Sequence, residues 1–103
     1  STGASTKKAQ IGPILGIAIR CLRPAELERL NVKGGVYVQD VVRGGLAAQS
    51  RIQAGDVITQ INGKQISGAN DFVESVSNLK NNTVARVAIV RQGQNAILGL
   101  RIR

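Results

Sequence analysis

Short runs of alternating hydrophobic and polar residues recur along this 103-residue chain. The first run, GIAIRCL at residues 16–22, is typical of a half-buried strand. Its alternation predicts that Ile17, Ile19 and Cys21 share one face, with Ala18 and Arg20 on the other. We therefore expect Cys21 to be a small buried hydrophobe.

Further runs have the composition of β-strands. GGVYVQDVV (residues 34–42) is rich in β-branched residues and begins with two glycines. DVITQI (residues 56–61) ends in Asn62-Gly63, a strong signal for a tight turn into the brief strand KQI. The final segment, residues 83–103, divides at Gln92-Gly93-Gln94 and is expected to form a hairpin of two strands.

Helical signals separate these strands. Pro24 suits a first helical turn, and Leu27 and Leu30 follow it on one face, so RPAELERLNV predicts a short helix. An Ala-rich stretch after Gly44-Gly45 is long enough for one or two helical turns.

The clearest helix is expected in GANDFVESVSNLKNN, residues 68–82. Phe72, Val76 and Leu79 follow the i, i+4, i+7 spacing of an amphipathic helix of two to three turns. Asn70 or Asp71 is expected to cap its beginning, and Asn81-Asn82 to end it.

These elements predict an α+β, mostly β fold. About six strands with one clear helix and one or two short ones do not alternate as a doubly wound sheet requires. We expect a small antiparallel barrel or sandwich of five to six strands capped by two to three helices. Residues 1–10, STGASTKKAQ, are expected to be a flexible lead-in or a cloning remnant, and residues 11–103 one folded domain.

Composition argues against catalysis by this chain. It contains no histidine, so Ser-His-Asp and Cys-His nucleophile systems are excluded. The single cysteine allows no internal disulfide, and we expect no metal site and no cofactor. The six carboxylates form no obvious acid–base pair, and the glycine pairs lack the Lys-Ser/Thr that follows a phosphate-binding loop. A binding module is the expected class, with no catalytic residues.

The formal net charge of +8 raises the alternative of a nucleic-acid binder. The basic residues are dispersed, however, and only Lys7-Lys8 and Arg101/Arg103 lie close together in sequence. No basic and aromatic residues interleave for base stacking. We interpret the charge as a cationic solvated surface, and expect no nucleic acid as partner and no membrane insertion.

The stretch GPILGIAIR, residues 12–20, has two readings. Its glycines and Pro13 are able simply to bend the chain into a core strand. Alternatively, a loop at Gly16 turns successive backbone N–H groups outward into a nest that binds an anion. An extended peptide beside the following strand would then end with its carboxylate in the nest.

Three motifs in order distinguish these readings: ILGI (residues 14–17), AGDVITQINGKQI (54–66) and NDFVESV (70–76). Together they resemble a PDZ domain of the HtrA/Deg (DegP/DegQ-like) bacterial serine proteases, and the resemblance covers residues 13–103. It favours the second or C-terminal PDZ domain of such a protein. It also implies bacterial-type strand order, in which AILGLRI takes the place of the first strand of animal PDZ domains.

The resemblance implies roles for particular residues. Backbone N–H groups of Leu15, Gly16 and Ile17 would bind a peptide's terminal carboxylate, and residues 17–20 would pair with its backbone. The pocket for the last side chain would be lined by Ile17, Ile19, Phe72 and Val76, and for Phe72 and Val76 a core position stays open as well. Val73 and Leu79 are assigned to the core or to the far end of the groove. Arg20 would hold peptide side chains or be solvated, and we favour the solvated reading. The implied peptide-binding set is Ile14, Leu15, Gly16, Ile17, Ala18, Ile19, Arg20, Phe72 and Val76.

The sequence departs from the family pattern in three places. Ile14 stands where the first glycine or aromatic residue of the loop is usual. Gly44-Gly45-Leu46-Ala47 stands where Gly-Ser-Pro-Ala is usual, and Arg51-Ile52 where Gly-Leu is usual. A left-handed Arg51 would cost roughly 1 kcal/mol relative to glycine. Asp56 is expected to cap a turn or pair with a nearby arginine.

The function expected from this resemblance is recognition of hydrophobic C-termini by β-strand addition. Without histidine, the class that reads Ser or Thr two residues before the end is excluded. The module would serve substrate recognition, regulation or oligomer assembly of a periplasmic or cell-envelope protease whose catalytic domain is absent here. Its partners would be unfolded proteins, the parent protease domain or neighbouring subunits. The alternative is a non-protease scaffold or secretion-system PDZ domain.

Overall fold

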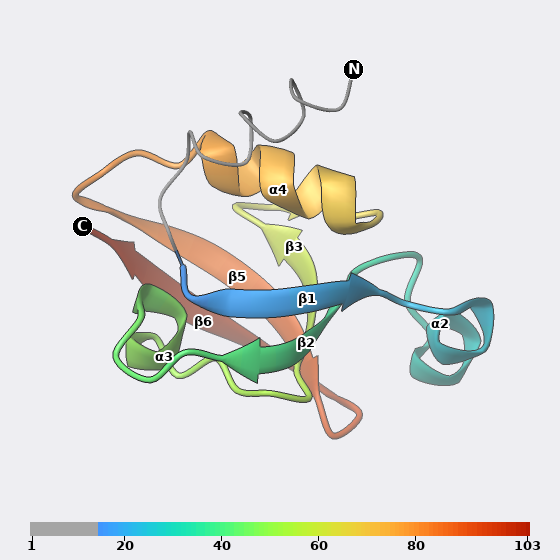
Figure 1. Cartoon of the computed structure of the whole chain (residues 1–103). Helices are drawn as coiled ribbons and strands as arrows, with labels where there is room; N and C mark the ends of the chain where they lie inside the picture. The colour runs from blue at the N-terminus through green and yellow to red at the C-terminus, as the bar shows by residue number, and fades with distance from the viewer. Residues whose placement is uncertain (1–14) are drawn as a thin grey trace, which may run out of the picture.

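The computed structural model describes residues 15–103 as one antiparallel sheet with three helices (Figure 1). The predicted α+β, mostly β fold is confirmed. The predicted boundary after residue 10 lies outside the described residues. In chain order the elements are β1 (Ile17–Cys21), α2 (Pro24–Leu30), β2 (Val36–Val41), α3 (Leu46–Gln49), β3 (Val57–Ile61), β4 (Lys64–Gln65), α4 (Ala69–Ser77), β5 (Thr83–Arg91) and β6 (Gln94–Ile102).

The sheet has two edges that matter below. Its strand order is β1-β2-β3-β5-β6, with the short β4 paired to β3. All pairs are antiparallel, and β5 and β6 pair along their full length. Strands β1 and β6 therefore lie at opposite edges, and α4 lies over the sheet alongside β1 (Figure 1).

Two predicted hairpin turns are confirmed by their backbone angles. Asn62 and Gly63 have φ of 53° and 81°, and Gln92 and Gly93 have φ of 52° and 79°. Positive φ at both central residues is the mark of a type I′ turn, whose twist matches that of the flanking strands. Each two-residue turn fixes the register of its hairpin.

The boundaries of the amphipathic helix differ from the prediction. The N-cap of α4 is Gly68, so the expectation that Asn70 or Asp71 caps the helix is wrong. Asp71 instead lies in the first turn, where Oδ2 accepts hydrogen bonds from the Ser67 N–H (3.0 Å) and hydroxyl (2.8 Å). These bonds hold the pKa of Asp71 below its usual value. The helix ends at Ser77, short of the expected Asn81-Asn82, because Asn78 already provides the C-cap.

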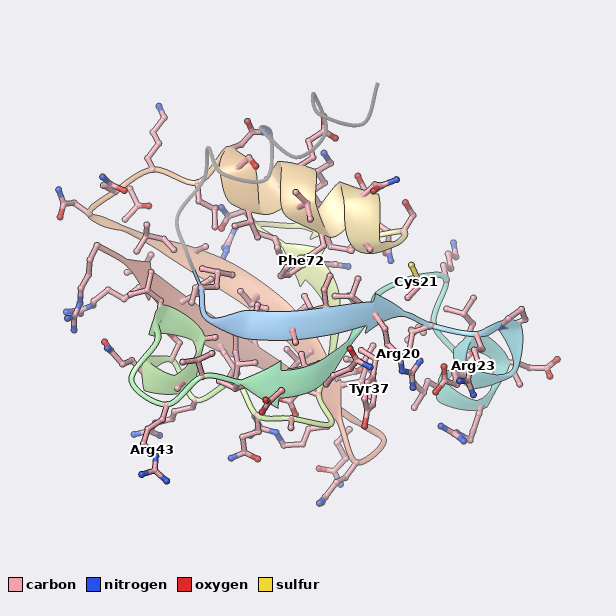
Figure 2. All side chains as sticks on the ribbon, viewed as in Figure 1. Arg20, Cys21, Arg23, Tyr37, Arg43 and Phe72 are labelled. Atoms are coloured by element: carbon pink, nitrogen blue, oxygen red, sulfur yellow. The ribbon has the colours of Figure 1, made fainter. Side chains whose placement is uncertain are left out.

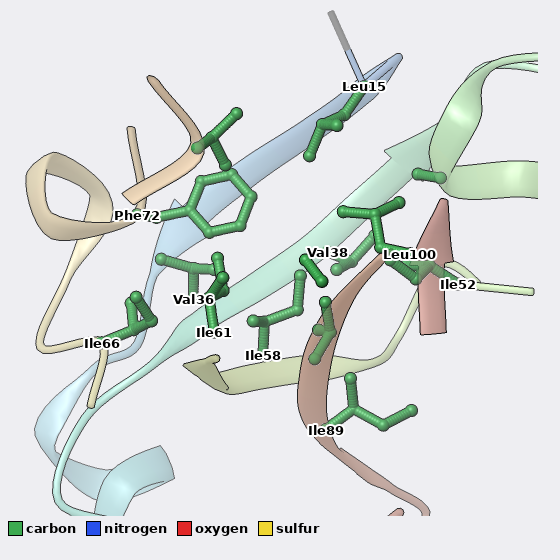
Figure 3. Close-up of a cluster of buried hydrophobic side chains, with 14 of the residues drawn as sticks. Leu15, Val36, Val38, Ile52, Ile58, Ile61, Ile66, Phe72, Ile89 and Leu100 are labelled. Carbon is green, nitrogen blue, oxygen red and sulfur yellow. The ribbon is translucent and has the colours of Figure 1, made fainter. Parts of the chain in front are cut away.

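The core is a single aliphatic cluster between the sheet and α4, with Phe72 as its one aromatic member (Figure 3). Ile58, Ile66, Ile89 and Leu100 are almost fully buried. Val73, in contrast, is 39% exposed, which excludes the core from its two predicted positions, the core and the far end of the groove. It follows Phe72 directly, and the helical rotation carries it from the apolar stripe toward solvent.

A buried carboxylate joins the β3 entry to β5. Asp56 is 1% exposed and accepts two hydrogen bonds from Arg91, at 2.8 and 2.7 Å, and one from the Gln53 N–H at 2.9 Å. Both predicted roles of Asp56, turn cap and arginine partner, are confirmed. Arg51 has the expected left-handed conformation (φ 72°), and its carbonyl accepts a bond from the same arginine.

The prediction that Cys21 is buried is wrong, since its side chain is exposed. The register shift between β1 and β2 skips Gln39 of β2, so the alternation of β1 itself is kept, and the exposure of Cys21 follows from its place as the last residue of the strand. Ile17 and Ile19 stay half-buried against the core, whereas Cys21 lies at the strand's exposed end.

Candidate functional site

The turn that leads into β1, residues 15–17, is held by two backbone hydrogen bonds. The Leu15 carbonyl accepts from the Ala47 N–H at 3.0 Å, and the Gly16 carbonyl accepts from the Val42 N–H at 2.8 Å. These bonds attach the turn to the first residues of α3 and to the end of β2. Both carbonyls thus point into the protein.

Gly16 is required at this turn for two reasons. Its φ of 72° is the left-handed conformation that side chains rarely adopt. A Cβ at this position would also lie 3.2 Å from Val42 Cβ and 3.4 Å from Gly45 Cα. Gly45 is packed as closely, because its own Cβ would lie 3.0 Å from the Leu15 carbonyl oxygen. The turn is therefore shaped by the mutual approach of two glycine backbones.

The N–H groups of Leu15 and Gly16 are the candidate ligand donors of the turn. Within residues 15–103, neither the Leu15 nor the Gly16 N–H donates to a backbone or side-chain acceptor. A left-handed residue at this place lets neighbouring N–H groups converge on one point, which is the geometry of an anion-binding nest. Ile14, the first residue of the predicted binding set, lies outside the described residues.

The strand that follows presents a free edge. Among the described strands, β1 pairs only with β2, so its other edge is open on the side of α4. An exposed edge of this kind accepts an additional extended chain through backbone hydrogen bonds. The nest stands at the beginning of this edge, where an antiparallel peptide would end. Ala18 is exposed along the strand.

The side chains predicted to line a pocket are brought together. Leu15, Phe72 and Val76 belong to the buried cluster, and Ile17 and Ile19 pack against it. Figure 3 shows the Phe72 ring projecting from α4 into this cluster. Phe72 is 5% and Val76 9% exposed. Both side chains therefore pack mainly in the core, and only a small part of each is exposed to line a pocket.

Arg20 is not free in solvent, contrary to our expectation. Its guanidinium makes two bonds of 2.8 Å with the carboxylate of Glu26 on α2. It also lies over the Tyr37 ring, 4.3 Å from its centroid, as Figure 2 shows beside β1. The Arg20 guanidinium, together with the Arg23 N–H, holds the pKa of Glu26 at about 2, well below its usual value of 4.5.

Sequence reasoning missed Glu26 and Tyr37 as neighbours of the β1 edge. A signal for Glu26 was present, because it stands three residues after the helix-capping position Arg23, as in a capping box. The bond from the Arg23 N–H to Glu26 (2.8 Å) is the local half of that motif. Tyr37 carried no comparable signal, because its position depends on the β1–β2 register.

The described residues also bear on metal binding and membrane insertion. Among residues 15–103, no three Cys, Asp or Glu side chains gather closely enough to hold a metal ion. No helix of this part of the chain combines the length and apolar character needed to span a membrane. A hollow of about 180 Å³ lies away from the nest, lined among others by Leu22, Leu30, Tyr37, Val57 and Val90.

Residues 13–101 match the sequence profile of the PDZ domain family. A protein from Hahella chejuensis described as a "probable periplasmic serine endoprotease DegP-like" is 36% identical to this chain over 102 residues. The match covers 96% of this chain and 22% of that protein. The protein of the same description from Pseudomonas putida (strain GB-1) is 29% identical over 101 residues, or 98% of this chain and 21% of that protein. The chain thus spans about a fifth of the length of these relatives.

Solved structures give a similar picture. A variant of the HtrA-type protease AlgW with a decapeptide superimposes with a TM-score of 0.81 at 25% identity, covering 98% of this chain and 32% of that chain. The HtrA3 PDZ domain bound to a phage-derived ligand has a TM-score of 0.73 at 22% identity, covering 86% and 83% of the two chains. The latter similarity bears on the fold alone.

Proposed function

The chain belongs to the PDZ domain family, and on that premise we propose that it binds the hydrophobic C-terminal ends of peptides by strand addition at β1. One observation carries the proposal. The Leu15 and Gly16 N–H groups, which have no acceptor among residues 15–103, stand at the end of a strand edge that no described strand occupies, and Gly16 is left-handed. An anion-binding nest at the end of an open edge fits a chain terminus, which offers a backbone and a carboxylate together.

The bound peptide would run antiparallel to β1. Its carboxylate would accept hydrogen bonds from the turn, and its last side chain would lie over Ile17 and Ile19, near α4. Because Phe72 and Val76 are already buried, the pocket for that side chain is shallow. We therefore expect small aliphatic ends such as Val or Ala to bind better than Phe.

Residues upstream of the peptide end would meet a cationic protein. The net charge of +8 favours acidic residues there, in a salt-dependent way. Arg20, the basic residue nearest this part of the edge, is already paired with Glu26. Its contribution is therefore largely internal, and the preference for acidic residues is expected to be modest.

The relatives set the context in which this binding would serve. Proteins named DegP-like periplasmic serine endoproteases match this chain over about a fifth of their length, and an HtrA-type protease of the same fold was solved with a decapeptide. We propose that the chain is a non-catalytic recognition, regulation or assembly module of such a protease in the periplasm or cell envelope. The absence of histidine leaves it without the base of a Ser-His-Asp triad.

The test compares peptides that differ only at the C-terminus. Isotope-labelled protein is titrated with a short peptide ending in Val, once with a free carboxylate and once with an amide. Hydrogen bonds to a charged acceptor contribute about 1.5–3 kcal/mol, so the amide should bind about tenfold to a hundredfold more weakly. Chemical-shift changes are expected at residues 15–19 and along α4.

Two results would count against the proposal. Equal binding of the acid and the amide would remove the nest from the mechanism. No shift with any hydrophobic peptide would favour an assembly scaffold, in which the β1 edge is used by a fixed partner.

A further inference from the structure

The sheet has a second edge, β6, which lies on the side away from β1. Within residues 15–103, β6 pairs only with β5. On β5, the Arg86 N–H donates to Asn62 Oδ1 at 2.8 Å, and the Arg86 carbonyl accepts from the Asn62 N–H at 2.7 Å. Both bonds point away from β6. In an antiparallel pair, residues that face each other are alternately hydrogen-bonded to each other and not. Because Arg86 uses its N–H and C=O on the side away from β6, its partner Gly99 is not bonded to it and directs its own N–H and C=O outward.

The same alternation applies to every second residue of β6. The Arg101 N–H donates outward to the Ser50 hydroxyl at 3.3 Å, so α3 and its C-cap cover that end of the edge (Figure 1). Asn95 and Ile97 have the same orientation as Gly99. None of these three residues donates to or accepts from another group among residues 15–103 through its outward backbone. We call residues 95–99 the outer β6 edge.

An apolar patch adjoins the outer β6 edge. Ile97 is 71% exposed and Val84, on the neighbouring strand, is 58% exposed. The Val84 side chain lies against Gly99, since a Cβ at residue 99 would be only 3.3 Å from Val84 Cγ1. Exposed edges are usually protected by proline, by a bulge or by a covering segment. Among the described residues, this edge is protected only at the Arg101 end.

The charge around this edge has one sign. Residues 83–103 include four arginines and no carboxylate. Only Arg91 has an ion-pair partner, the buried Asp56, in the part of the chain that the structure describes. Arg86 lies opposite Gly99, and Arg101 follows two residues later, so both arginines lie at one end of the outer β6 edge. A strand added here would meet aliphatic side chains and one positive end.

We propose that the outer β6 edge binds an extended segment of another protein that has aliphatic residues along its length and acidic residues where it passes Arg86 and Arg101. Two other occupants fit less well by charge. Residues 1–14 carry Lys7 and Lys8 and no carboxylate, and a second copy would bring another charge of +8 to the same edge. This binding is separate from that at β1 and requires no free C-terminus.

The test uses a peptide that cannot enter the nest. The full chain, isotope-labelled, is titrated with acetyl-EVTVTVE-amide and with its lysine counterpart acetyl-KVTVTVK-amide. We expect chemical-shift changes at residues 94–101 and not at residues 15–21. The acidic peptide should bind about tenfold more tightly than the basic one at low salt, and the difference should shrink as salt is added.

Two variants of Ile97 test backbone pairing at the edge. Ile97→Pro removes the outward N–H and leaves the hydrogen bonds between β6 and β5 in place. It should weaken binding of the acidic peptide roughly tenfold. Ile97→Val keeps the N–H and should bind as the unchanged protein does. A dispersed amide spectrum verifies that each variant is folded, and Arg86→Gln with Arg101→Gln tests the charge should the proline variant not fold.

The proposal fails on any of four results. The first is equal binding of the acidic and basic peptides, and the second is chemical-shift changes confined to the β1 edge. The third is chemical-shift changes at β6 that depend on protein concentration alone, which would indicate that a second copy binds there. The fourth is a stronger response of the same residues to a short DNA duplex, which would indicate a general anion surface. The carboxylate test at β1 is unaffected by each of these outcomes, because its peptide ends in a free terminus.

Discussion

The substitution Gly16→Ala tests the turn on which the proposed function rests. Alanine must adopt the left-handed conformation at φ 72°, which costs roughly 1–2 kcal/mol relative to glycine. Its Cβ would also lie 3.2 Å from Val42 Cβ, closer than the optimum of about 3.5–4.0 Å for two carbons. Relieving that contact moves the turn, so we expect a total loss of about 2–4 kcal/mol in the free energy of unfolding.

Gly63→Ala is the matched control. Gly63 has a similar φ of 81°, but no atom lies within 4 Å of the position its Cβ would take. This variant should lose only the conformational term, about 1–2 kcal/mol. The difference between the two variants isolates the packing of Gly16 against Val42 and Gly45.

The two variants should differ more in their affinity for a peptide than in their free energy of unfolding. Gly16→Ala displaces the Leu15 and Gly16 N–H groups, so a peptide with a free C-terminal Val should bind at least about tenfold more weakly. Gly63→Ala should bind it unchanged. Urea unfolding and titration of the carboxylate peptide measure the two quantities. Unchanged peptide affinity in a folded Gly16→Ala variant would refute the assignment of the turn as the carboxylate site.

Three further substitutions test the surroundings of the site. Phe72→Ala should cost about 3–5 kcal/mol in urea unfolding, because it empties the core under α4; a loss below about 1 kcal/mol would mean that the ring is not packed. Asp56→Ala leaves Arg91 without its partner and should cost about 2–4 kcal/mol, whereas a neutral effect would contradict the buried ion pair. Glu26 has its pKa lowered from 4.5 to about 2, so the stability from its pair with Arg20 is complete above pH 4.5 and is lost as the pH falls toward 2. Glu26→Gln should therefore flatten the fall of the melting temperature in that range, and an unchanged profile would show that the pair does not contribute.

Much of the fold follows from local signals in the sequence. Asn-Gly and Gln-Gly at the two hairpins specify positive φ at both positions, and that preference needs no distant contact. The i, i+4, i+7 spacing around Phe72 places a helix, since an apolar stripe must cover a core. The left-handed Arg51 was also predictable, because it replaces a glycine of the family pattern.

The sequence by itself therefore determined the order of the strands and helices, the type of the two hairpin turns and the glycine that shapes the nest. Only the tertiary structure decided which side chains meet across strands. The register of β1 against β2 set Arg20 opposite Tyr37, and Cys21 came to lie at the exposed end of β1. The pairing of β5 with Asn62 turned the backbone of β6 outward. Periodicity reports on one chain segment at a time, whereas register depends on contacts between segments far apart in sequence. For that reason the sequence was enough to propose the turn at Gly16 as a binding site, but not the outer β6 edge.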